Sequence, residues 1–158
     1  MFEGKRITLR RLLTRKFRLQ AGLAIETMIT TDNVLNMIPK VEGICIEFAL
    51  GILNSKLISW VYVNTSMIAQ KDDFPQVHIS ALSKIHLPKS DKVQHDKMVT
   101  LVVQMLDAHK RKATDIDSAG HERLQRLIDS TDRQIDRLVY ELYGLTEEEI
   151  KIVEEASV

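Results

Sequence analysis

The sequence has little of what a disulfide-stapled or metal-bound domain requires. Its 158 residues include one cysteine, three prolines and only 5% aromatic residues. Cys45 alone can form neither a disulfide framework nor a zinc cluster, and its apolar neighbours predict a buried, inert thiol. Residues 1–20 also lack the charged and then apolar order of a secretory signal peptide. We therefore expect an intracellular, cytoplasmic protein.

Catalytic motifs are also lacking. There is no glycine-rich phosphate loop, no Gly-x-Ser-x-Gly, no zinc-spaced cysteine or histidine cluster, and no Asp/Asn-Pro-Pro-Tyr motif for adenine methylation. His78 and His86 are best interpreted as hydrogen-bonded structural side chains. Asp72 and Asp73 are adjacent and point apart, whereas metal-dependent cleavage needs converging carboxylates. We therefore predict no catalysis by this chain alone, no cofactor and no metal.

The chain also has no uninterrupted apolar run long enough for a membrane. Residues 43–63 form the most apolar stretch, but Glu47 and Lys56 interrupt it, and a spanning helix needs about 20 nearly uninterrupted apolar residues. Apolar positions recur at spacings of three and four, which predicts a central buried helix over residues 44–62 that includes Trp60 in the core. Within it, Asn54 and Ser55 are predicted to be packing or capping groups.

Acidic side chains are nearly absent from the N-terminal segment. Residues 1–20 hold seven basic side chains and one acidic side chain, Glu3, although the whole chain has 22 of each sign. This asymmetry predicts a polyanionic partner for that segment, with a solvated surface as the alternative. In contrast, residues 115–158 hold five basic and twelve acidic side chains. The basic candidates are Lys5, Arg6, Arg10, Arg11, Arg15, Lys16 and Arg18.

Short strands are expected before the central helix. Residues 5–13 alternate poorly but are rich in β-formers and arginine, residues 16–19 repeat the theme, and residues 34–38 follow a predicted turn. After the helix, residues 74–88 predict a strand, a one-turn helix capped by Ser80, and a second strand closed by Pro88.

Two long helices are predicted in the second half. Apolar residues at steps of three and four mark residues 91–111 and 122–143, and the short polar link favours antiparallel pairing. Gly144 should end the second helix in a left-handed cap, and Thr146 and Glu149 predict a capping box for a helix over 147–154. The expected fold class is α+β: a small mixed sheet around a buried central helix, a long antiparallel helical hairpin, and a short C-terminal helix. We expect two domains, residues 1–90 and 91–158.

Three stretches together carry a family resemblance. They are LGILNSKLISWVY at 50–62, FPQVHISALSKIHLP at 74–88 and IDRLVYELYGLTEEEIKIVE at 135–154. In order and spacing they resemble the C-terminal part of TaqI-like specificity domains, and KRITLRRLL resembles the strand that opens the second half of such a domain. The resemblance extends over nearly the whole chain. These domains are the target-recognition regions of N6-adenine DNA methyltransferases and fused type II restriction-modification enzymes.

The resemblance implies a non-catalytic recognition module. Such a domain sits opposite a methyltransferase catalytic domain, with double-stranded DNA between them and the target adenine flipped out. The seven basic residues would contact DNA, through guanine edges or through phosphates. The alternatives are a structural module that docks a methyltransferase domain, or a piece of a type I restriction specificity subunit. Because the chain starts in mid-domain by this resemblance, we read it as a fragment and expect a homodimer through strand edges and the hairpin stripes.

Overall fold

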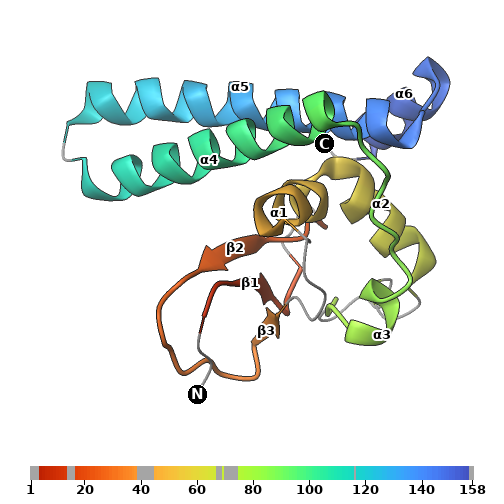
Figure 1. Ribbon diagram of the computed structural model, residues 1–158, viewed down its shortest axis with the longest axis horizontal. Helices are drawn as coiled ribbons and strands as arrows, with labels where there is room; N and C mark the ends of the chain where they lie inside the picture. Colours follow the sequence, from red (N-terminus) through yellow and green to blue (C-terminus); the bar gives the residue numbers. More distant parts are fainter. Residues whose placement is uncertain are drawn as a thin grey trace.

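The computed structural model describes residues 4–13, 17–38, 45–66, 69, 75–115 and 117–156. The predicted α+β class is confirmed, with a three-stranded sheet below a helical layer (Figure 1). The sheet is antiparallel, in the order β2-β1-β3, where a mixed sheet was expected. The elements are β1 Arg6–Arg10, β2 Ala21–Ala24, β3 Val34–Met37, α1 Ile46–Asn54, α2 Lys56–Thr65, α3 Ile79–Leu82, α4 Lys92–Thr114, α5 Ser118–Tyr143 and α6 Glu147–Glu155.

The two faces of the sheet differ because side chains alternate along a strand. Ile7 and Leu9 of β1 are buried on the face that packs against α1. Arg6, Thr8 and Arg10 therefore share the opposite face, which we call the outer face. Both β2 and β3 run antiparallel to β1, so they run parallel to each other. Residues 25–33, which we call the crossover loop, must pass from one edge of the sheet to the other (Figure 1).

The strand expected at residues 16–19 does not form among the described residues 17–19. Phe17 has φ 52°, in the left-handed region that a strand excludes. The amide of Leu19 donates to the Ser59 hydroxyl at 3.1 Å, so this segment bonds to a helix. The second strand begins instead at Ala21, where the small residues had given no clear strand signal.

The single central helix predicted for residues 44–62 is wrong. The segment is two helices, α1 and α2, which meet at 64°. Ser55 lies between them in an extended conformation, and its hydroxyl accepts from the Ile58 amide and donates to the Ile52 carbonyl. The side chain thus completes one helix and caps the next, as capping serines do. The predicted capping role of Ser55 is confirmed. Trp60 is only partly buried and packs at the margin of the core.

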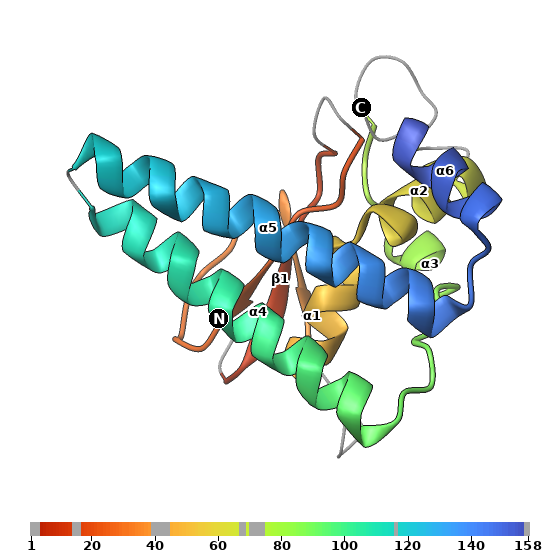
Figure 2. The ribbon, with the colours of Figure 1, turned by 90° about the horizontal axis from the view of Figure 1, so that it is seen from above.

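The predicted helical hairpin is confirmed and is longer than expected. Helices α4 and α5 lie side by side over α1, and their joined end extends past the sheet (Figure 2). Gly144 adopts φ 68°, and Thr146 and Glu149 form the predicted capping box. Most of the hairpin's apolar stripe is buried within the chain, including Met98, Leu101, Ile135 and Leu138.

The segment after α2 departs from its prediction. Helix α3 is preceded by His78 in the N-cap position, and Ser80 lies inside the helix, so the Ser80 cap is wrong. The second strand before Pro88 is also absent, because residues 83–88 turn and then run without strand pairing. The first predicted strand is reduced to one bridge between Leu12 and Gln76.

One continuous apolar core joins the sheet, α1, α2 and the hairpin. Gly51 of α1 permits the close approach of α4, since a β-carbon there would lie 2.5 Å from the Met98 sulfur. Among the described residues, no single helix has the length and hydropathy to cross a membrane. The bent pair α1 and α2 meets those criteria only when taken together, and most of its apolar side chains are buried.

Candidate nucleic-acid interface

Arg10 is the exposed basic side chain of the outer face. Its position at the end of β1 follows from strand alternation, and its guanidinium donates to the Gln20 side chain at 3.3 Å. Next to it in the face, the Thr8 hydroxyl donates to the Gly22 carbonyl at 3.3 Å. A basic side chain beside small polar residues is an arrangement suited to an anionic partner.

Arg6 lies on the same face but is completely buried. Its guanidinium donates to the Asn36 side chain at 3.1 Å, to the Gly4 carbonyl at 2.9 Å, and to the Glu26 carbonyl at 3.1 Å. Asn36 in turn donates to the Thr30 hydroxyl at 2.8 Å. Arg6 therefore holds the crossover loop against the outer face, and in this conformation it cannot reach an external phosphate.

Arg11 and Lys5 are also engaged within the chain. The Arg11 guanidinium donates to the Asp32 carbonyl at 3.3 Å, near the end of the crossover loop. Lys5 pairs with Glu47 of α1, and the hydrogen bond from Lys5 lowers the pKa of the Glu47 carboxyl. Both lysine and arginine remain partly accessible at the surface. An ion pair at the surface such as Lys5–Glu47 contributes about 1 kcal/mol or less to stability.

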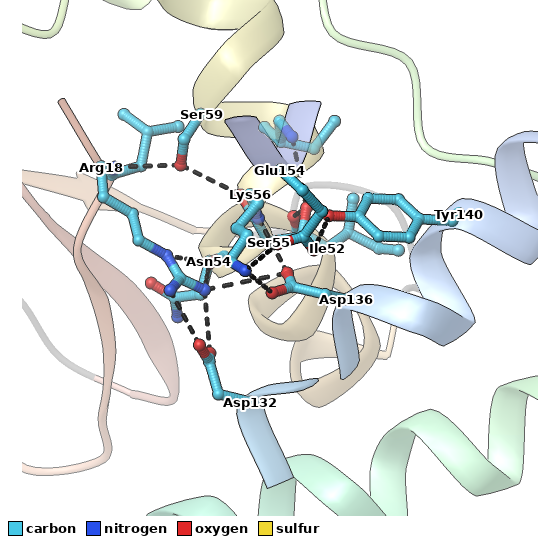
Figure 3. A network of polar contacts seen from close by, with 12 residues as sticks. Arg18, Ile52, Asn54, Ser55, Lys56, Ser59, Asp132, Asp136, Tyr140 and Glu154 are labelled. Carbon is cyan, nitrogen blue, oxygen red and sulfur yellow. Dashed lines mark hydrogen bonds and ion pairs between the residues drawn. The ribbon is translucent and has the colours of Figure 1, made fainter. Parts of the chain in front are cut away.

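Arg18 belongs to a different place, the junction between the N-terminal segment and the hairpin (Figure 3). It forms two parallel hydrogen bonds with Asp132 of α5, both at 2.8 Å, and donates to the Asn54 carbonyl. Such a two-pronged pair fixes orientation as well as charge. Composition predicted one basic site, but the structure divides its residues between two places. Arg18 pairs with Asp132, 114 residues further along the chain, whereas Arg10 faces outward.

The junction continues into a buried carboxylate (Figure 3). Asp136 accepts from the Lys56 amide at 2.8 Å, at the start of α2, and lies 3.8 Å from the Arg18 guanidinium. Burial raises the pKa of the Asp136 carboxyl to about 6, although the Lys56 amide and the charge of Arg18 oppose the change. Glu154 of α6 accepts from Lys56 and from the Tyr140 hydroxyl. This network positions the helices, and we assign it no ligand.

Asn54 has a role that its sequence position did not show. Its side chain accepts from the Ala21 amide at 2.8 Å and donates to the Ala21 carbonyl at 3.0 Å. It therefore pairs with the outer edge of β2 as a neighbouring strand would, which protects that edge. The predicted packing role is confirmed. Only the Asn-Ser pair, unusual in so apolar a stretch, could have signalled it.

The remaining candidates, Arg15 and Lys16, lie outside the described residues, as do Asp72 and Asp73. No group of three or more histidine, cysteine, aspartate or glutamate side chains in the described part of the chain could hold a metal ion. The crossover loop was not predicted from the sequence. Its composition resembled an ordinary turn, and the sheet order that carries it across the outer face cannot be read from local sequence.

The fold is similar to part of a larger solved structure. It is similar to the solved structure of the type IIL restriction-modification enzyme MmeI in complex with DNA, with a TM-score of 0.70 and 12% identity over 99% of this chain and 21% of that chain. The chain belongs to the family of TaqI-like C-terminal specificity domains, whose model matches residues 1–87. The family match thus includes the first resembling stretch and all of the second except Pro88, and it ends before the third.

A relative from Methanocaldococcus jannaschii is similar over part of its length. It is named provisionally as a type II restriction enzyme and methyltransferase, RM.MjaORFECS2P, and is 35% identical over 92 residues. The aligned part makes up 56% of this chain and 8% of that protein. The chain therefore spans a small fraction of both the curated relative and MmeI.

Proposed function

We propose that this chain is a double-stranded DNA recognition module of a restriction-modification system. Its membership of the TaqI-like specificity domain family carries the proposal. The exposed Arg10 beside Gln20, and the excess of basic residues in the segment 1–20, support an anionic partner. The names of the similar proteins, which describe restriction, methylation and a complex with DNA, agree with it.

The chemistry would belong to another domain. The chain has none of the motifs for methyl transfer, and a recognition module that faces a methyltransferase domain across bound DNA needs none of its own. The acidic composition of residues 115–158 disfavours DNA contact along α5 and α6 and leaves them to pack against protein. Incubation with S-adenosylmethionine and duplex DNA should give no methyl transfer, and transfer by this chain alone would contradict this part of the proposal.

DNA binding can be tested through its salt dependence. Each phosphate that a basic side chain neutralises adds about 0.9 to the logarithmic slope of affinity against salt. Arg10→Glu should therefore lower both the affinity for a duplex and the slope, by about one. Arg10 is preferred to Arg11 because Arg11 also holds the crossover loop.

Arg123→Glu is the matched control, since Arg123 is an exposed arginine of the acidic helix α5. It changes the net charge by the same amount and should leave the slope unchanged. Equal effects of the two substitutions would show that only overall charge matters, and the outer face would lose its assignment as the contact surface.

We also propose that the isolated chain forms a homodimer. The hairpin stripe is largely covered, but in the described part of the chain the edge strand β3 and the apolar groove beside it, about 410 Å³ in volume, offer another surface for association. Ile38 and Ile79 lie in that groove, 51% and 68% exposed. Strand edges and exposed apolar patches favour association with another chain. Sedimentation at micromolar concentration should show a dimer, and an 18 kDa monomer would refute the proposal.

A further inference from the structure

We infer that the crossover loop, residues 25–33, is the segment of this chain that reads DNA bases. The inference rests on the proposed function and makes it specific. The loop leaves β2 beside Arg6 and reaches β3 beside Arg10, since Ala24 pairs with Arg6 and Val34 pairs with Arg10. Because the outer-face side chain of Arg6 donates to the Glu26 carbonyl, the loop lies along the same outer face that carries the exposed arginine, where it can meet the same partner.

The loop is exposed and at the same time held at several points. Every residue from 25 to 33 is exposed except Thr30, which is half-buried. Arg6 holds the Glu26 carbonyl, Asn36 holds the Thr30 hydroxyl, and Arg11 holds the Asp32 carbonyl. Completely burying an arginine is costly, and one of its terminal nitrogens, Nη2, has no hydrogen-bond partner. A recognition segment needs this kind of support, because a preordered loop loses less conformational entropy when it binds.

The side chains between these attachment points suit a DNA groove. Met28 and Ile29 are 40% and 82% exposed, and apolar side chains of this kind insert between base steps in architectural DNA-binding proteins. Thr27 is exposed beside them, and threonine can contact either base edges or the thymine methyl group.

Glu26 and Asp32 argue against a loop that lies on phosphates. Both are exposed carboxylates, which the phosphate backbone would repel. At a base edge, by contrast, a carboxylate can accept from the amino group of cytosine. Arg10, Arg11 and Gln20 lie at the β3 end of the loop and can hold the flanking phosphates. The charges thus place the loop in the groove and the arginines on the backbone.

Selection from a randomised duplex library tests this inference. The full chain, Thr27→Ala and the double variant Met28→Ala/Ile29→Ala would each be used to enrich bound duplexes. These side chains are exposed and make none of the bonds that hold the loop, so the variants should fold. Val93→Ala is the matched control, because Val93 is 76% exposed on α4, outside the loop.

We expect the unaltered chain and the Val93 variant to enrich the same sequence. In each loop variant, the preference for one base over the others should fall about tenfold or more at one or two positions of the enriched sequence. The slope of its affinity against salt should stay the same. If the loop variants still bind duplexes and enrich the same sequence as the unaltered chain, the inference is overturned but the proposed function stands. Met28 and Ile29 would then be assigned to a contact with protein. Absence of duplex binding by the unaltered chain would overturn the proposed function as well.

Discussion

Replacing the buried carboxylate of the helix junction should change how stability depends on pH. Asp136 is 2% exposed, and its Oδ2 atom has no hydrogen-bond partner. Asp136→Asn keeps an acceptor for the Lys56 amide, which donates at 2.8 Å, but removes the charge. The difference between the two proteins therefore isolates the titration of one carboxyl group from that of the other acids.

The sign and size follow from the pKa. Burial raises the pKa of Asp136 from its ordinary 3.8 to about 6, so the folded state holds this proton more tightly than the unfolded state. The resulting stabilisation is complete below pH 3.8 and is lost as the pH rises through about 6. Each pKa unit corresponds to about 1.4 kcal/mol, so the loss approaches about 3 kcal/mol.

Urea denaturation from about pH 4 to about pH 7.5, followed by circular dichroism, would measure this. The unfolding free energy of the unaltered chain, relative to that of Asp136→Asn, should fall with rising pH by up to about 3 kcal/mol. A constant difference, or one that rises with pH, would refute the claim that desolvation outweighs the attraction of Arg18 and Lys56 for this carboxylate.

Four further substitutions test the packing, the charge pairs and the helix ends. Arg18→Ala should lower the unfolding free energy by about 2–4 kcal/mol, because it removes a positive charge beside the buried Asp136 carboxylate. Its control, Lys5→Ala, should lower the unfolding free energy by less than about 1 kcal/mol. Equal effects would show that the Arg18 charge contributes no more than an ordinary surface charge. Gly51→Ala should lower the unfolding free energy by about 1–3 kcal/mol, since the new β-carbon would lie 2.5 Å from the Met98 sulfur and 2.9 Å from a Val102 methyl group. An unchanged unfolding free energy would mean that α4 can shift away at no cost. Thr146→Ala removes the capping box of α6 and should cost about 1 kcal/mol by thermal denaturation, whereas an unchanged midpoint would show that α6 needs no cap.

Local pattern was sufficient to predict the helical half of the fold. The steps of three and four in α4 and α5 identify one buried face, and Gly144 and Thr146 are local signals of a helix end and a helix start. The same reasoning failed at Ser55, because a stretch that is apolar almost all round shows no change of face where it bends. The bend depends on one hydroxyl that bonds in both directions, to Ile52 and to Ile58.

The site was harder to predict because composition does not show direction. Arg6, Arg10 and Arg18 are close in sequence, yet one is buried under a loop, one faces outward, and one binds Asp132 on the far helix. The partners of Arg6 and Arg18 come from elements whose placement depends on the sheet order and on the hairpin packing. Residue counting could identify an unusually basic segment but could not separate its buried or paired arginines from those that face outward.

The most direct test of the DNA-recognition assignment is to map the contact surface on the folded chain. Amide resonances of the labelled protein would be followed while a duplex enriched by the unaltered chain is added at moderate salt. We predict that the largest shifts fall on residues 8–11 and 25–33, with little change along α5. Shifts confined to the hairpin, or no shifts at a duplex concentration that saturates binding, would contradict recognition of DNA through the outer face and its crossover loop.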